Sequence, residues 1–311
     1  MRMLRLAGIP LLLGMLLLSA CGAEREPAKT ASPSEEVGGF VMSPLKRSVS
    51  EEELGFYSPQ MKAIYARGVL RVAMPAMDRK PFFYNNEEGV LSGSDVALAA
   101  DMAAQLGVGV EYVRSVGSFE EVVNQVASGQ ADIAVSKLSA TLPRAQKVLF
   151  SAPYLKLRQG LLLNRLAMAR LGSGNQAPLA LLRQAKVKIG VIAGTSYVSY
   201  ANLLFPDAEI VPFATPQASM DAAIQGEVAA IYYDELQLKQ LLAGNPDRSI
   251  DLQLHLMPDQ VDPIAIAVPP DDQRLLAWVN LYLQNNQARI DGLLAAYGMG
   301  QAGETGSAAG R

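Results

Sequence analysis

The sequence has few of the residues on which catalytic and metal sites depend. Its 311 residues include one cysteine, Cys21, and one histidine, His255. One cysteine excludes an intrachain disulfide, and the lack of a Cys/His cluster argues against a zinc site. Neither a Ser–His nor a Cys–His nucleophile pair is convincing, and neither glycine-rich phosphate-binding motif is present. We therefore predict a chain that is not an enzyme and that carries no metal and no cofactor.

Runs of like charge and long apolar runs are also missing. The chain has 27 basic and 30 acidic side chains, a formal net charge of −3. No basic run interleaved with aromatics occurs, which argues against nucleic-acid binding. Beyond the N-terminus no apolar run is long enough to span a bilayer. We expect one soluble, monomeric body.

The N-terminus has the pattern of an export signal. Residues 1–20 combine a basic start with a short apolar run and small residues. Leu18-Ser-Ala-Cys21 resembles the bacterial lipobox, which implies cleavage before Cys21 and acylation of that residue. We predict a lipoprotein signal peptide over 1–20, a flexible tether over 21–60 and a disordered tail over 301–311. The expected location is periplasmic or extracytoplasmic, with lipid anchoring through Cys21.

The globular part, from about Ser58 to Gly300, alternates strand and helix patterns. Strands are predicted over 68–74 and 110–113, and helices over 96–106 and 119–127. The pattern recurs with strands over 186–192, 210–213 and 228–233, helices around 198–204 and over 216–224, and a final helix over 273–285. Such alternation indicates parallel α/β sheets.

Two segments match internally. Residues 128–137 and 225–234 each consist of a helix end, a glycine and a buried strand, and Lys137 and Asp234 occupy equivalent positions at the strand ends. The match predicts two similar α/β lobes that present strand ends to a shared cleft, where ligands of α/β sheets bind.

Three strand ends carry groups that suit a zwitterion. Arg144 supplies a planar fork for a carboxylate. Gly194-Thr195-Ser196, between a strand and a helix, can hold an anion or form an ordinary turn and cap. Asp234 can hold an ammonium or cap the next helix. Together they predict a receptor for an α-amino acid.

The chain resembles the bacterial extracellular solute-binding proteins of family 3, the polar amino acid receptors of ABC importers. The resemblance rests on motifs spread over 62–300, among them Leu91-Ser-Gly-Ser-Asp-Val, Ser139-Ala-Thr-Leu-Pro-Arg144 and Val191-Ile-Ala-Gly-Thr195. It implies a type II periplasmic-binding-protein fold with lobes 62–156 plus 265–300 and 157–264, joined by a two-strand hinge. It also implies an ABC permease as partner and ligand capture by hinge closure.

The resemblance also implies roles for individual residues. Arg144 would clamp the α-carboxylate with help from Thr195, and Asp234 would hold the α-ammonium. The Ser136 backbone and the Ser139 hydroxyl would bind the ligand, and Phe119 would form a wall of its pocket. Asp95 and Asp132 would brace turns.

Three positions depart from the family pattern. Arg79 stands where an aromatic residue often stacks on the ligand, and Lys137 replaces a small residue. Lys137 could enter the ligand space or reach an acidic ligand, but we expect it to extend to solvent. Residues 261–263, Val-Asp-Pro, could alter the hinge. Arg79 and Lys137 suggest a ligand with a polar or acidic side chain.

Two other functions remain open at this point. The same fold could serve a sensory or regulatory lipoprotein. It could also serve an enzyme, since cyclohexadienyl dehydratases and the front module of some lytic transglycosylases look similar. A dehydratase needs a proton donor at the leaving hydroxyl, and none can be assigned from the sequence.

Overall fold

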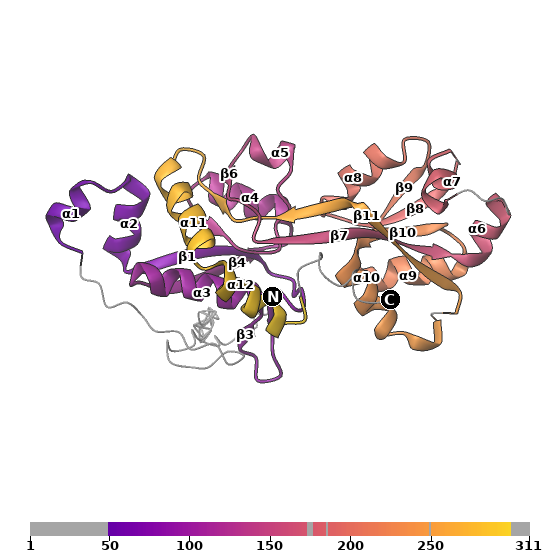
Figure 1. Ribbon diagram of the computed structural model, residues 1–311, viewed down its shortest axis with the longest axis horizontal. Coiled ribbons are helices and arrows are strands. Elements are labelled where there is room, and N and C mark those ends of the chain that lie inside the picture. Colours follow the sequence, from indigo (N-terminus) through magenta and orange to yellow (C-terminus); the bar gives the residue numbers. More distant parts are fainter. Residues whose placement is uncertain (1–48, 173–176, 185, 249, 300–311) are drawn as a thin grey trace, which may run out of the picture.

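The chain folds into two α/β lobes that lie side by side, as Figure 1 shows for the computed structural model. The structure describes residues 49–172, 177–184, 186–248 and 250–299. The predicted signal peptide, the Cys21 lipidation site and the tail over 301–311 lie outside these ranges. Within them, no helix is long and apolar enough to cross a membrane.

The first lobe contains both described ends of the chain. Its helices are α1 (Glu51–Gly55), α2 (Pro59–Arg67), α3 (Ser94–Leu106), α4 (Phe119–Ala127), α5 (Leu142–Ala145), α11 (Gln273–Asn285) and α12 (Gln287–Ala296). Its strands are β1 (Val69–Pro75), β2 (Tyr84–Asn85), β3 (Leu91–Ser92), β4 (Gly109–Val116), β5 (Ile133–Ala134), β6 (Leu149–Phe150) and β12 (Ala267–Val268).

The second lobe is built from the middle of the chain. Its helices are α6 (Arg165–Leu171), α7 (Pro178–Gln184), α8 (Tyr197–Leu204), α9 (Pro216–Gln225), α10 (Glu235–Ala243) and the 3-10 helix η1 (Pro246–Arg248). Its strands are β7 (Leu155–Asn164), β8 (Lys188–Ile192), β9 (Glu209–Phe213), β10 (Ala230–Asp234) and β11 (Leu252–Ile264).

Each lobe has one five-stranded sheet. The strand orders are β4-β1-β5-β12-β6 and β11-β7-β10-β8-β9. β1 is parallel to β4 and β5, and β8 is parallel to β9 and β10. The predicted parallel pairing within two similar α/β lobes is therefore confirmed, and Lys137, shortly after β5, contacts Asp234 at the end of β10 in the other lobe.

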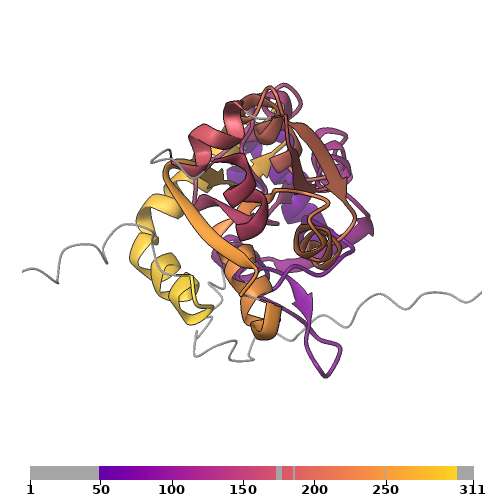
Figure 2. The ribbon, with the colours of Figure 1, turned by 90° about the vertical axis from the view of Figure 1, so that its right-hand side faces the viewer.

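Two long strands connect the lobes. β7 and β11 pair antiparallel and run from one half of the molecule to the other, and the end-on view of Figure 2 shows β11 crossing the body. Their register shifts between Met257 and Val261, so Pro258, Asp259 and Gln260 have no partner on β7. This extra backbone lies directly before the Val-Asp-Pro segment that departs from the family pattern. The implied lobe boundaries stay a prediction.

Local signals set the helices that border the gap. Ser118 and Glu121 form a reciprocal capping box at the start of α4, which begins and ends where predicted. α3 begins after Gly93, whose φ of 130° is accessible to glycine. A Cβ at this position would lie 2.2 Å from the carbonyl oxygen of Phe82. Gly93 therefore lets the start of α3 pack directly on the backbone of the Phe82 loop.

The last part of the predicted tether differs from that expectation. α1 lies within 21–60, with a cap from Ser50 to the Glu53 N–H. Ser58 caps α2 and also donates to Asp272, at the start of α11. This segment is folded because its caps and its contact with α11 supply partners that composition alone does not reveal.

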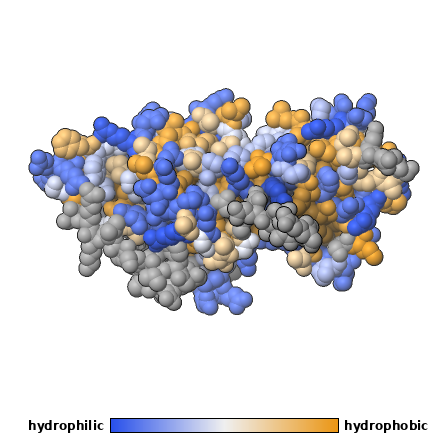
Figure 3. Space-filling model, in the orientation of Figure 1, coloured by the Kyte–Doolittle hydropathy of each residue, from blue (hydrophilic) through white to orange (hydrophobic). Residues whose placement is uncertain are grey.

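Each lobe has its own hydrophobic core. One cluster of buried residues surrounds β1 and the other surrounds β8 and β10. On the face shown in Figure 3, polar and apolar side chains are interspersed over both lobes. Two separate cores make each lobe a rigid unit, which suits motion at the two connecting strands.

Candidate functional site

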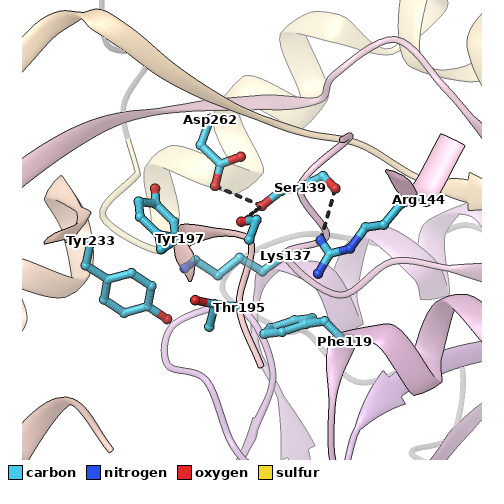
Figure 4. Close-up of a pocket in the computed structure, with 9 residues that line it drawn as sticks. Phe119, Lys137, Ser139, Arg144, Thr195, Tyr197, Tyr233 and Asp262 are labelled. Carbon is cyan, nitrogen blue, oxygen red and sulfur yellow. Dashed lines mark hydrogen bonds between the residues drawn. The ribbon is translucent and has the colours of Figure 1, made fainter. Parts of the chain in front are cut away.

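The candidate site lies where the two lobes meet (Figure 4). The first lobe, the second lobe and β11 all contribute, through Phe119, Lys137, Ser139, Arg144, Thr195, Ser196, Tyr197, Tyr233 and Asp262. The space between these side chains has a volume of about 10 Å³. That is room for about one water molecule. The lobes are therefore closed on each other, and a larger ligand needs them to open or rearrange.

Arg144 forms one end of the site. Its guanidinium is 3% exposed although it belongs to a four-residue helix, α5. Nε donates to Glu120 at 2.8 Å, and Nη1 donates to the Ser139 carbonyl at 3.1 Å. Glu120 is 51% exposed, so it neutralises the guanidinium weakly. Nη2 donates to no group among the described residues, which leaves donor capacity for an anion.

The turn before α8 brings hydroxyl groups from the second lobe. Gly194 has a φ of 71°, and the Thr195 hydroxyl donates to the Ile192 carbonyl at 2.7 Å. Thr195 lines the space, but in this geometry its hydroxyl proton is already used. Ser196 contacts the other lobe instead, with its Oγ 2.8 Å from Ser139 Oγ. The lobes are thus joined by a serine–serine hydrogen bond.

Asp234 forms the opposite end of the site. It is fully buried at the end of β10, and Oδ1 caps α10 through the Gln237 N–H at 2.9 Å. Oδ2 accepts a hydrogen bond from Lys137 Nζ at 2.6 Å. The ammonium also lies 4.8 Å from the Tyr233 ring centroid and 5.5 Å from that of Phe82. Asp234 therefore holds an ammonium, and this ammonium is the side chain of Lys137.

The expectation that Lys137 extends to solvent is wrong, because the side chain is 5% exposed and turned into the site. Burial alone would lower the pKa of Lys137, but the Asp234 carboxylate raises it, and the net shift is upward. Lys137 is therefore charged. Its partner lies 97 residues further along the chain, a distance at which local sequence patterns carry no information.

The backbone of Lys137 is held in an uncommon conformation. Its φ of 52° is the one positive value at a non-glycine position within the described ranges. Asp95, on α3, accepts the Lys137 N–H at 2.5 Å. Burial raises the pKa of Asp95 to about 7. Asp95 thus braces the turn as predicted, and Asp132 braces another by accepting hydrogen bonds from Arg67 and Arg71.

Asp262, on β11, was not predicted as a site residue. Ser139 donates to Oδ2 at 2.9 Å and Tyr200 donates to Oδ1 at 3.3 Å. Burial raises the pKa of Asp262 to about 6. The only signal in the sequence was the unusual Val-Asp-Pro segment, which suggested a change in the hinge rather than an acid in the site.

The hydroxyl of Tyr197 lines the space and is buried without a protein hydrogen-bond partner in the described part of the chain. The Ser136 hydroxyl, two residues beyond β5, is also buried without such a partner but does not line the space. Tyr197 packs edge-on against Tyr233, with ring centroids 4.9 Å apart. Tyr197 was also missed from the sequence, where an aromatic at the start of a helix gives no indication of a site.

Arg79 lies beside the site rather than in it. It lines a second space of about 20 Å³ on the other side of Phe119, together with Gly194. Arg79 donates to the Asp78 carbonyl, and it forms no ion pair within the described ranges. The structure therefore places Arg79 one side chain away from Arg144, across Phe119.

Comparisons with known proteins agree with this architecture. The family model of the bacterial extracellular solute-binding proteins, family 3, matches residues 70–298. An ancestral amino acid-binding protein, described as a precursor of cyclohexadienyl dehydratase, is 26% identical with a TM-score of 0.62, over 77% of this chain and 99% of the other. An amino acid ABC transporter substrate-binding protein of Streptococcus pneumoniae, bound to L-arginine, is 28% identical with a TM-score of 0.62, over 76% and 98%. An L-cysteine receptor of Neisseria gonorrhoeae is 27% identical with a TM-score of 0.61, over 76% and 92%. The type II fold is thereby confirmed.

One curated relative is an enzyme. The cyclohexadienyl dehydratase of Pseudomonas aeruginosa is 38% identical over 97 residues, which are 31% of this chain and 35% of the dehydratase. The match thus covers about a third of the enzyme's length.

Proposed function

Because the chain belongs to the bacterial extracellular solute-binding proteins of family 3, we propose that it captures an amino acid, or a close carboxylate analogue of one, between its lobes. Hinge motion of β7 and β11 opens and closes the site, and an ABC importer receives the ligand. Anchoring through an acylated Cys21 is part of the proposal, as is an extracytoplasmic location.

Arg144 carries the proposal. A buried guanidinium whose one acid partner among the described residues is half exposed favours binding of an anion, and its planar fork suits a carboxylate. The second lobe brings Ser196 and Thr195 to the same space. An anion bound there would contact both lobes, so binding would stabilise the closed form.

A ligand panel tests this function. Thermal unfolding of the full chain is recorded with the standard amino acids and with their 2-oxo, 2-hydroxy and unsubstituted carboxylate analogues. A ligand at 100 times its Kd should add about 2.7 kcal/mol of stability. Arg144→Ala should abolish the shift. Arg248→Ala, which removes an exposed arginine paired with Asp221 on the second lobe, is the matched control and should preserve it.

Dehydration of a bound cyclohexadienyl acid is a second candidate, favoured by Asp262. A carboxyl group with a pKa of about 6 can donate a proton near neutral pH, and the partial likeness to the dehydratase points the same way. Loss of water from such a substrate, followed by absorbance and abolished by Asp262→Asn, would support it. Ligand binding without turnover would leave the binding function.

A further inference from the structure

Lys137 occupies the position that an amino group of the ligand would need. We propose that the site therefore selects a carboxylate without an α-ammonium over the corresponding α-amino acid. The inference deepens the proposed function and rests on it, because Arg144 must still bind the ligand's carboxylate. It narrows the ligand to a class such as 2-oxo, 2-hydroxy or unsubstituted acids.

The Lys137 ammonium already has the surroundings of a bound amino ligand. One carboxylate oxygen lies at 2.6 Å, and two aromatic faces lie at 4.8 and 5.5 Å from Nζ. A carboxylate combined with aromatic faces is a typical recognition site for an ammonium ion. The second oxygen of Asp234 is bonded to the Gln237 N–H. Each oxygen of Asp234 thus already binds a donor, and a ligand's amino group would have to share or displace the Lys137 ammonium at this carboxylate.

The backbone directs the lysine into this position. A positive φ at a residue other than glycine is held only where the surroundings enforce it, and such residues cluster at functional sites. Here the buried Asp95 fixes the Lys137 N–H. The side chain consequently leaves the end of β5 toward the other lobe, and Figure 4 shows it reaching across the middle of the site.

Among the residues that the structure describes, Asp262 is the one acid that lines the space. It already accepts hydrogen bonds from Ser139 on one oxygen and from Tyr200 on the other. A second ammonium beside Lys137 would also be repelled, since like charges in a low-dielectric site interact strongly. The amino acid would have to displace a buried charge from its partner, which opposes binding.

The groups that remain suit an oxygen-rich acid. Arg144 has a spare donor, and the Tyr197 hydroxyl lines the space and is buried without a protein partner in the described chain. Hydroxyl groups can donate to an oxo or hydroxyl oxygen as well as to a carboxylate. Arg144 and Tyr197 can therefore replace the contacts that an amino group would have made.

Matched ligand pairs test the inference by calorimetry on the full chain. The pairs are L-glutamate and 2-oxoglutarate, L-alanine and pyruvate, and L-phenylalanine and phenylpyruvate. At least one oxo acid should bind the wild type, on the order of 100-fold more tightly than its amino acid. Lys137→Gly removes the ammonium and tolerates the positive φ, so it should reverse the preference. Lys188→Ala, which removes an exposed lysine at the start of β8, is the control and should preserve it.

The outcomes separate the two levels of the proposal. A wild type that binds amino acids as tightly as oxo acids, with the same preference in Lys137→Gly, overturns the inference and leaves the proposed function standing. A wild type that binds neither amino acids nor oxo acids overturns both the inference and the proposed function. If circular dichroism shows that Lys137→Gly does not fold, Lys137→Asn is used, because asparagine also tolerates this backbone region.

Discussion

Each end of the site has a buried cation paired with an acid, but the acid is buried at one end and half exposed at the other. At one end, Asp234 and Lys137 are both buried and satisfy each other across the lobes. At the other end, Arg144 is buried, and its one acid partner in the described part of the chain is the half-exposed Glu120. A buried charge that lacks a full partner inside the protein is suited to a ligand. The comparison indicates that this chain completes one end of the site itself and leaves the other for the ligand.

Removing one acid from each end should give the largest contrast. Asp234→Asn keeps the α10 cap but leaves Lys137 charged and buried, so we expect the free energy of unfolding to fall by about 3–5 kcal/mol. Glu120→Gln removes a half-exposed partner and should cost about 0–1 kcal/mol. Urea unfolding of both variants measures the difference. Equal losses would contradict the distinction between the two ends.

Arg144→Lys should weaken ligand binding, because an ammonium cannot reproduce the planar fork of donors. One lost hydrogen bond to a charged group corresponds to about 1.5–3 kcal/mol, or roughly 10- to 100-fold in Kd. Calorimetry with the tightest ligand of the panel gives the value, and Arg248→Lys serves as control. An unchanged Kd would show that a positive charge alone suffices at this end.

The acid between the two ends should make stability depend on pH. The pKa of Asp262 is raised from 3.8 to about 6 by burial, against the lowering effect of Lys137. The folded protein therefore holds this proton when the unfolded chain has lost it. Its contribution to stability is complete below pH 4 and is lost as the pH rises to about 6.

The size of this contribution is roughly 1–3 kcal/mol. Urea unfolding between pH 4 and pH 7 measures it as the difference between the wild type and Asp262→Asn, in which the dependence should be weaker. Asp247→Asn, in the exposed η1, is the control. A wild type and an Asp262→Asn variant with parallel pH profiles would place the Asp262 pKa near its ordinary value.

The smallest effect should come from a contact at the rim of the site. Gln237 Nε2 donates to the Lys80 carbonyl of the other lobe at 3.1 Å, in an exposed position. Water can replace this hydrogen bond, so Gln237→Ala should change the free energy of unfolding by about 0.5 kcal/mol or less. A larger loss would mean that rim contacts hold the lobes together in addition to the buried Lys137–Asp234 and Ser139–Ser196 contacts.

Much of the fold could be predicted because its signals are local. Ser118 and Glu121 fix the start of α4, and Pro216 and Gly226 bound α9. The β7–β11 pair was expected only from the family resemblance, since its partners are about 100 residues apart and no short pattern encodes their register. The sequence predicts a tether over 51–55 because composition alone does not reveal the cap that Ser50 provides to α1.

The site could be predicted only in part for the same reason. The match between 128–137 and 225–234 located both strand ends, so Lys137 and Asp234 were recognised as equivalent positions. That equivalence gave the position of each residue but not the direction of the lysine side chain, and a lysine is ordinarily exposed. Asp262 lies on β11, which brings it to the site. No sequence pattern near Ser139 indicates the hydrogen bond between the two residues.

The groups that surround the Lys137 ammonium are Asp234, Tyr233 and Phe82. Their arrangement depends on Gly93, which is not one of them. Even a methyl group at this position would overlap the backbone of Phe82, whose ring faces the Lys137 ammonium. Any substitution would displace the Phe82 backbone or the first turn of α3, and Asp95, which fixes the lysine backbone, belongs to that turn. An attempt to redesign what this protein recognises should therefore keep position 93 unchanged, however far from the ligand it lies.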